Sequence, residues 1–378
     1  MPLVDMKHML HHAYDHGYAV GAFDVASVDF LDGIIMAAEQ ASAPVILSLT
    51  ESRLADFNGA VMMPAVEAAA MRAQVPVAIH FDHGSGLEPA ISGIRLGCNG
   101  VQIDLAHLDT AENTQITRQV VKTAQACGIP VEGNPGDLVC TSLAGIKAYV
   151  ERTGVDFLAI SVDAAYGRMK GKPEPDYSPL KQINEALKIP LVIHDGNRLS
   201  HEQCRQLIAN GVSKINSDTA LSAMAGKQVR ENVRTDTSAD CIGLLKDINR
   251  VIAVEVERCI RLWGAAGRGA EVLVQCQPWS PVEHLIIYNV EGLDDAGAKT
   301  MMAEGRRVLA AIPGVREVFT GEAVQADARY RYTWLVRFCH PAVIDSYRTH
   351  PAHVAFADNW FRPVAGKRIS IDFQSVEH

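Results

Sequence analysis

The chain has 378 residues, with 35 Lys and Arg against 44 Asp and Glu, so its formal net charge is −9. This balance disfavours a nucleic-acid-binding function, which needs a broad cationic surface. Hydrophobic residues make up 48% and charged residues 21% of the composition, which excludes a disordered or fibrous chain and indicates a compact fold with a large core. Small molecules or other proteins are the expected partners.

The sequence also argues against a membrane or secreted protein. No run approaches the roughly 18 apolar residues of a membrane span, and the first residues carry charges where a signal peptide needs an apolar run. The eight cysteines show no CxxC spacing, which disfavours a disulfide framework and a thiolate zinc site. We therefore expect a cytoplasmic protein with reduced thiols and no membrane partner.

Residues 1–270 repeat one pattern, a short apolar run followed by a polar turn and a helix-length amphipathic stretch. Eight such units in about 250 residues predict a closed (β/α)8 TIM barrel rather than an open sheet. The expected strands are Tyr18–Phe23, Val45–Leu49, Val77–Phe81, Gly100–Ile103, Ile129–Glu132, Phe157–Val162, Leu191–Ile193 and Ser213–Ile215.

Polar residues follow nearly every one of these runs. Such barrels gather their chemistry at the C-terminal ends of the strands, so we expect these side chains to meet at one mouth. A single one would be interpreted as a helix cap, but eight in phase predict a functional site. They are Asp24, Thr50, Glu51, Asp82, His83, Asp104, Glu132, Asn134, Asp163, His194, Asp195, Asn216 and Asp218.

The pattern changes after the predicted helix Leu244–Trp263. Residues 271–281 are interpreted as a linker, and residues 282–378 predict strand, helix, two strands, two helices and a last strand. This βαββαβ order is typical of a ferredoxin-like α+β domain, which leaves one sheet face open. We expect a second copy to cover that face, so that the protein is a homo-oligomer, at least a dimer.

The first 270 residues resemble class II fructose-bisphosphate aldolases and their ketose-bisphosphate relatives. The motifs that carry the resemblance are GYAVGAFDV, VPVAIHFDHGS, GVQIDLAHL, YVERTGVDFLAI, KIPLVIHDG and GVSKINSDT. The resemblance implies a lyase with a divalent metal, zinc before others, acting on a small-molecule carbonyl substrate. It implies that Asp82 is the acid/base, His83 and His194 are metal ligands, and the substrate-binding residues are Asp24, Thr50, Gly196, Asn197, Asn216, Asp218 and Thr219.

The sequence departs from this family where the chemistry lies. Tyr166 replaces the middle metal histidine, Asn134 replaces a glutamate, and the long catalytic loop expected after Gly136 is nearly absent. Catalytic zinc sites use three protein ligands, whereas the two histidines supply only two. The candidates for additional metal or site residues are Asp104, Asn134, Asp163, Tyr166 and Asp195. His80 precedes His83 by three positions, and strand alternation predicts that the two point to opposite faces.

The last hundred residues resemble the Dabb family, the stress-responsive A/B-barrel domains. The resemblance rests on VEHLIIYNV, IPGVREVFTG and YRTHPAHVAFADNWFRP. It implies dimerisation through the open sheets. A related plant polyketide cyclase uses a tyrosine and a histidine in this stretch, so His284, Tyr347 and His353 form a candidate Dabb site.

Three hypotheses therefore remain open. The first is a divergent metal-dependent lyase that cleaves or forms a carbon–carbon bond next to a carbonyl, on a substrate that need not be a sugar bisphosphate. The second is a barrel without turnover that binds a metabolite or serves as a scaffold. The third is a cyclase-like activity in the C-terminal domain.

Overall fold

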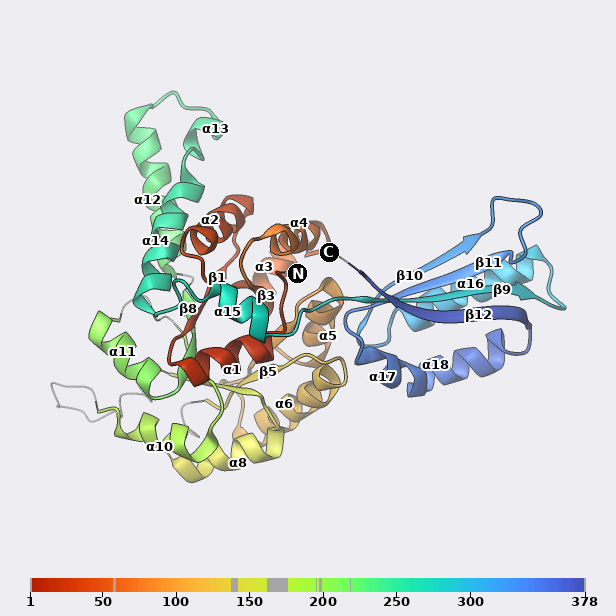
Figure 1. Cartoon of the computed structure of the whole chain (residues 1–378), viewed down its shortest axis with the longest axis horizontal. Helices are drawn as coiled ribbons and strands as arrows, with labels where there is room; N and C mark the ends of the chain where they lie inside the picture. Colours follow the sequence, from red (N-terminus) through yellow and green to blue (C-terminus); the bar gives the residue numbers. More distant parts are fainter. Residues whose placement is uncertain are drawn as a thin grey trace.

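The computed structural model describes residues 2–56, 59–136, 142–161, 176–194, 196, 199–217 and 219–376. Figure 1 shows two units, a barrel built from the first two thirds of the chain and a smaller sheet domain beside it. Within the described ranges, no helix combines the length and the apolar character needed to cross a bilayer.

The first unit is a closed barrel of eight parallel strands in the order β1 to β8, which confirms the predicted fold. Its strands are nearly all buried, as expected for strands covered by helices outside and by side chains inside. They are β1 (Val20–Asp24), β2 (Val45–Thr50), β3 (Val77–Gly84), β4 (Gly100–Asp104), β5 (Val131–Asn134), β6 (Phe157–Ile160), β7 (Leu191–Ile193) and β8 (Val212–Ser217).

Several helices around the barrel begin at a residue whose side chain caps the first turn. Ser27 caps α2, Asp109 caps α6, and Ser200 forms a capping box with Gln203 at α11. The outer helices are α2 (Val28–Gln40), α3 (Glu51–Asp56), α4 (Gly59–Arg72), α5 (Leu87–Leu96), α6 (Thr110–Gln125), α8 (Leu143–Thr153), α10 (Ser178–Leu187) and α11 (His201–Ala209).

The N-terminal helix α1 (Met6–His16) covers the end of the barrel where the strands begin. Met6 lies against Gly100, the first residue of β4, and the α1 residues Met9 and Leu10 are completely buried. The opposite, C-terminal end of the strands is therefore left for a site, as in other barrels of this kind.

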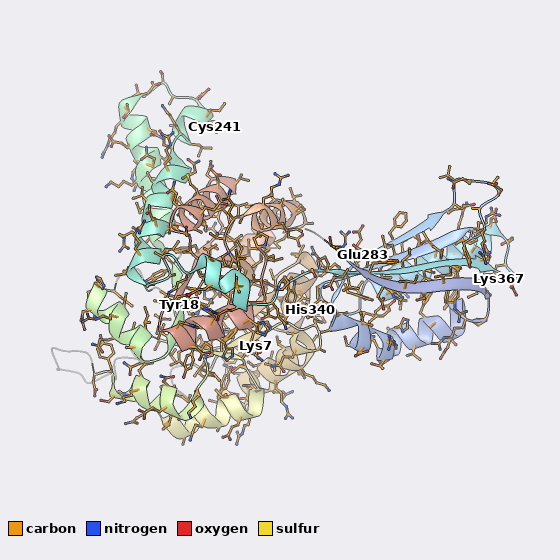
Figure 2. The ribbon with its side chains drawn as sticks, viewed as in Figure 1. Lys7, Tyr18, Cys241, Glu283, His340 and Lys367 are labelled. Atoms are coloured by element: carbon orange, nitrogen blue, oxygen red, sulfur yellow. The ribbon has the colours of Figure 1, made fainter. Side chains whose placement is uncertain are left out.

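A helical arm follows β8. It consists of α12 (Thr219–Thr235), α13 (Cys241–Leu244) and α14 (Ile248–Leu262), and it projects from the barrel with Cys241 near its tip (Figures 1 and 2). The sequence predicted only the returning helix, with an earlier start at Leu244. The base of the arm is held because α14 packs on α2 and Trp263 stacks on Phe23 of β1.

The second unit is a four-stranded antiparallel sheet with helices on one face, in the strand order β10-β11-β9-β12. This order is that of a ferredoxin-like α+β domain, as predicted. Its elements are β9 (Val282–Val290), α16 (Asp295–Leu309), β10 (Val315–Glu322), β11 (Tyr332–Phe338), α17 (Val343–Thr349), α18 (Pro351–Phe356), the π-helical turn η2 (Ala357–Phe361) and β12 (Ala365–Gln374).

The segment between the units is more ordered than the predicted linker. Helix α15 (Gly269–Gln275) occupies half of it, and the chain then runs beside the N-terminal residues, where Trp279 N–H donates to the carbonyl of Leu3. The second unit docks on the barrel through Arg316, whose guanidinium pairs with Glu67 at 2.6 Å. Figure 2 shows His340 at this junction, where its ring stacks on Trp279 at 4.3 Å between centroids.

Candidate active site and metal centre

Asp82 and His83 reach the barrel mouth from the end of β3. The register of β3 with β4 shifts between Phe81 and Gly84, and His83 adopts a left-handed backbone conformation with φ of 55°. The backbone N–H of His83 is held there by Gln102 Oε1 at 2.5 Å. Because of this irregularity, side-chain alternation fails and both neighbours face the site.

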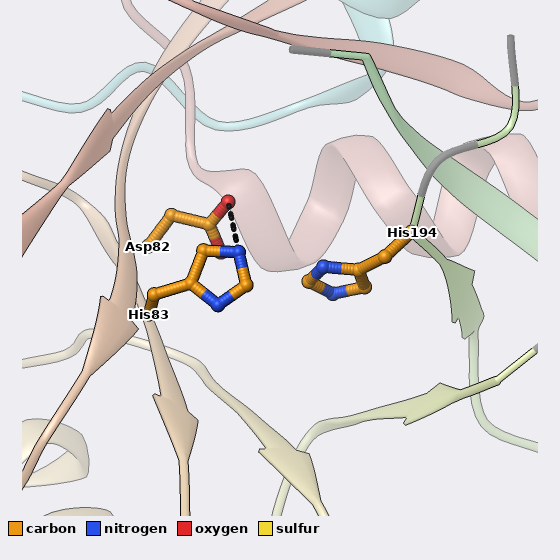
Figure 3. Close-up of side chains that lie close together, drawn as sticks. All are labelled: Asp82, His83 and His194. Atoms are coloured by element: carbon orange, nitrogen blue, oxygen red, sulfur yellow. Dashed lines mark ion pairs between the residues drawn. The ribbon is translucent and has the colours of Figure 1, made fainter. Parts of the chain in front are cut away.

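The ring of His194, directly after β7, approaches from across the barrel. One ligand atom from each of Asp82, His83 and His194 lies within 4.8 Å of the others, and the two imidazole centroids are 5.3 Å apart (Figure 3). His83 Nε2 is 4.0 Å from Asp82 Oδ2. Two imidazoles and a carboxylate are a donor set that zinc accepts, so these residues suit the metal that the resemblance implies.

Each of these histidines has a carboxylate behind it. His83 Nδ1–H donates to Asp104 Oδ2 at 3.0 Å, and His194 Nε2–H donates to Glu132 Oε1 at 3.1 Å. A carboxylate on one ring nitrogen leaves the lone pair of the other nitrogen for a metal, as is usual for metal-ligating histidines. Asn134 Nδ2 in turn donates to Asp104 Oδ1 at 3.1 Å. The structure therefore places Asp104 and Asn134 behind His83.

Charges buried below the mouth set the protonation of the site. Lys214 Nζ lies 2.7 Å from Glu132 Oε2, and both side chains are completely buried. Burial acts to raise the pKa of Glu132, but Lys214 and the hydrogen bond from His194 lower it to about 2. Burial likewise opposes ionisation of Asp82, yet Lys214 and His194 hold its pKa below the usual range. Both carboxyl groups are therefore anionic at neutral pH.

His80 lies between these two carboxylates rather than on the outer face of β3. Its ring is completely buried, with Nε2 3.8 Å from Asp82 Oδ1 and 3.7 Å from Glu132 Oε2. Burial and the Lys214 charge lower the pKa of His80 to about 3, so the ring is neutral. The predicted opposition of His80 and His83 is wrong because of the register shift, although His80 is buried as expected.

The mouth forms a cavity of about 90 Å³ that brings six of the predicted site residues together. Asn216 Nδ2 donates to Asp82 Oδ2 at 2.9 Å, and Ser48 Oγ donates to the same oxygen at 3.1 Å. The carboxylate of Asp82 is thereby fixed at the cavity wall. The lining residues are Ala22, Asp24, Ser48, Thr50, Asp82, His83, His194, Asn216 and Ser217.

Other predicted residues lie elsewhere. The backbone of Gly196 packs against Ile215 of β8, so a larger residue there would clash, and Thr219 is exposed at the start of α12. Neither residue lines the cavity. Five predicted residues fall outside the described part of the chain: Asp163, Tyr166, Asp195, Asn197 and Asp218.

The sequence did not single out Lys214, and it placed Glu132 among the polar residues of the mouth without giving it a role. Lys214 is a lone cation within the buried strand β8, and Glu132 lies within the buried strand β5. A charge inside a strand buried on both faces must be paired. That rule would have matched Lys214 with a buried carboxylate, although the sequence offers no way to choose which one.

The second domain has a cavity of its own, of about 210 Å³, between its sheet and its helices. His284 Nδ1 bonds Asp372 Oδ1 at 2.6 Å, and the Tyr347 and His353 rings pack 4.4 Å apart. Burial lowers the pKa of His353 and raises that of Tyr347. The three predicted residues of the Dabb site therefore line one cavity.

The fold and the site together define the class of this protein. It is a TIM-barrel protein with a candidate metal centre of aspartate and histidine at the mouth of the barrel. The family model described as class-II fructose-bisphosphate aldolase matches residues 4–268, and that of the stress responsive A/B barrel domain matches residues 282–375. The chain belongs to the class-II fructose-bisphosphate aldolase family, whose members are metal-dependent lyases, and carries a Dabb domain after the barrel.

Individual relatives agree with this assignment. The fructose-bisphosphate aldolase of Geobacillus stearothermophilus is 34% identical over 287 residues, covering 72% of this chain and 100% of that protein. A probable fructose-bisphosphate aldolase of Bacillus subtilis is 34% identical over 248 residues, covering 62% and 87%. The crystal structure of the YdjI aldolase from Escherichia coli K12 matches with a TM-score of 0.63 at 28% identity, covering 71% of this chain and 99% of that chain.

Proposed function

We propose that the barrel is a divalent-metal-dependent lyase that cleaves or forms a carbon–carbon bond next to a carbonyl group. Zinc is the proposed metal, and Asp82, His83 and His194 are the residues that would hold it or act beside it. The observation that carries the proposal is the convergence of these three side chains within 4.8 Å at the barrel mouth. The substrate is a small ketone or hydroxyketone that need not be a sugar bisphosphate.

Asp82 is the proposed acid/base. Its carboxylate is anionic and accepts hydrogen bonds from Ser48 and Asn216. It can therefore accept the proton of a substrate hydroxyl group on the carbon β to the ketone. As that hydroxyl becomes an aldehyde, the carbon–carbon bond breaks and its electron pair moves toward the ketone oxygen. A bound divalent ion would supply the positive charge that stabilises this developing negative charge. The amide of Asn216 would donate to the same region of the substrate.

The test is turnover by the zinc-loaded protein on a panel of hydroxyketones with and without phosphate. We expect cleavage of at least one, and Asp82→Asn should lower kcat by roughly a hundredfold or more while zinc remains bound. A protein that binds these ketones but never cleaves them would instead support the alternative of a metabolite-binding barrel.

A second candidate function lies in the C-terminal cavity. We infer that the His284–Asp372 pair, with Tyr347 and His353, forms a second site for an anionic, largely apolar molecule. Arg348, Arg362 and Arg368 also line this cavity, against a single carboxylate from Asp372. Two variants of the full chain distinguish this function from that of the barrel. Turnover that survives Asp82→Asn and is lost in His284→Ala would assign the chemistry to this domain.

The open sheet face of this domain is the proposed dimer surface. The helix-facing positions include Tyr288 and Trp334, which pack on Phe361 and Phe356, so the alternate positions point away from the helices. Those positions pair across all four strands in an apolar row of Phe319, Leu335, Leu285 and Ile371. Phe319 is 52% exposed and Ile371 is 47% exposed. A second copy would bury this row.

A further inference from the structure

The ion pair of Lys214 and Glu132 is placed where it does more than hold the barrel together. Both side chains have no exposed surface, and they link β8 to β5 across the barrel interior. Removing two charges from water is costly, and apolar residues of similar size often replace such a pair without loss of stability. Packing alone therefore does not account for two buried charges directly below the mouth.

The contacts of Glu132 point to a role toward His194. One carboxylate oxygen faces the Lys214 ammonium at 2.7 Å, and the other accepts from His194 Nε2–H at 3.1 Å. A carboxylate with an ammonium beside it can only accept hydrogen bonds, so the hydrogen of a neutral His194 ring must sit on Nε2. The lone pair is then on Nδ1, and Asn216 Nδ2 lies 3.5 Å from that nitrogen.

In His83 the roles of the two ring nitrogens are exchanged relative to His194. Its Nδ1 is bound by Asp104, so its Nε2 is the nitrogen turned toward Asp82. The two rings thus present different nitrogens to one cluster, and each choice is made by a carboxylate behind the ring. The carboxylate behind His83 is part-exposed, whereas Glu132 is fully buried and needs Lys214 to remain there as an anion.

We propose that Glu132 is a positioning residue for His194 and that Lys214 is its obligatory counter-ion. Together they fix the ring so that Nδ1 faces the cluster of Asp82 and His83. This inference rests on the proposed metal-dependent function. Because the chain lacks the family's middle metal histidine, the orientation of the two remaining rings, His83 and His194, must be held by the carboxylates behind them.

The experiment compares zinc affinity in two double variants of the full chain. Glu132→Leu with Lys214→Met removes the buried pair without leaving a lone charge, and Glu67→Leu with Arg316→Met removes the pair at the domain junction as a matched control. Zinc dissociation constants are measured by competition with a chromophoric chelator, and folding is checked by circular dichroism. We expect the first variant to bind zinc roughly 10- to 100-fold more weakly and the control to bind as the wild type does.

A folded first variant that binds zinc within twofold of the wild type would overturn the inference and leave the proposed function standing. A wild type that binds no zinc would overturn both. A readout that needs no variant is the ring tautomer of His194 in the metal-free wild type, from nitrogen-15 NMR at a pH where the ring is neutral. The hydrogen is expected on Nε2, and finding it on Nδ1 would also overturn the inference.

Discussion

His83 is the side chain whose charge decides whether the mouth can accept a cation. The hydrogen bond to Asp104, with the nearby charges of Asp82 and Glu132, raises the pKa of His83 to about 9 in the metal-free protein, although burial opposes this. A protonated imidazole has no lone pair for a metal. Uptake of a metal must therefore release a proton from this ring near neutral pH.

The first prediction concerns the pH dependence of metal binding. Apparent zinc affinity should rise by about tenfold per pH unit between pH 7 and 9 and level off above, with one proton released per ion near pH 7. Calorimetric titrations in buffers of different ionisation enthalpy measure both quantities. Affinity that does not change over this window would show that the His83 ring is already neutral.

The second prediction concerns the stability of the metal-free protein, which should fall as the pH rises while the zinc affinity rises. The pKa of His83 is higher in the folded than in the unfolded chain, where it is about 6.5, so the ring stabilises the fold fully only below pH 6.5. That contribution should be lost as the pH rises from 6.5 through 9. The comparison is the denaturation midpoint of the wild type and of His83→Gln, which should converge toward pH 9.

At the scale of single residues, the sequence predicted the reactive side chains better than the side chains that hold them in place. Asp82, His83 and His194 each follow a predicted strand, and the barrel rule alone brings them to one mouth. The partners behind them, Glu132 and Lys214, come from strands far apart in sequence, and only the closed register places them together. The direction of His83 depends on a local backbone irregularity that no side-chain pattern reveals.

Helix packing onto the barrel is decided by individual glycines. Gly33 lies inside α2, and a Cβ there would be 2.5 Å from the carbonyl oxygen of Asn249 and 2.9 Å from Ile252 Cβ on α14. These contacts are too close for a backbone carbonyl and a branched side chain to accommodate. The arm therefore approaches the barrel closely only because α2 lacks a side chain at this point.

The third prediction follows from this contact. Alanine in a helix interior normally stabilises relative to glycine, but Gly33→Ala should destabilise the protein by about 1–3 kcal/mol because two helices must separate. Gly226→Ala in α12 is the matched control, since its nearest neighbour is the flexible end of Arg230 at 3.4 Å. That control should be more stable by about 0.5–1 kcal/mol. Equal effects at the two positions, measured by urea denaturation, would contradict this account of the packing.

At the level of elements the sequence was most informative about strands and least informative about the arm. Each of the eight apolar runs corresponds to a strand, because a parallel strand buried on both faces needs a continuous apolar stretch. Helix α12 has only one buried residue, Leu221, and so lacks the apolar stripe by which a helix is recognised. The short helix α15 in the predicted linker was missed because its 7 residues are too few to show a periodic apolar pattern.

The whole molecule joins a barrel to a domain whose open face remains uncovered in one chain. The row of Phe319, Leu335, Leu285 and Ile371 is flanked by an ion pair of Arg337 with Glu283 at 2.6 Å. An apolar centre with a charged border is typical of surfaces that bind a partner.

The fourth prediction concerns oligomeric state. Phe319→Asp or Ile371→Asp should convert a dimer to a monomer at micromolar concentration, with little change in thermal stability, because both side chains are exposed in the single chain. Val324→Asp, at a 95% exposed position outside the sheet, is the control and should leave the dimer intact. Analytical ultracentrifugation measures the mass. Dimers that persist in both sheet variants would place the interface elsewhere.

The proposed metal centre is tested most directly by the metal content of the purified, zinc-reconstituted chain. This content is determined by inductively coupled plasma mass spectrometry after exhaustive dialysis. We predict about one zinc ion per chain in the wild type and almost none in His83→Ala or His194→Ala, because each variant removes one of the imidazoles at the mouth. A wild type that retains no divalent metal, or one whose zinc is unaffected by both substitutions, would contradict the claim that this mouth is a metal-dependent active site.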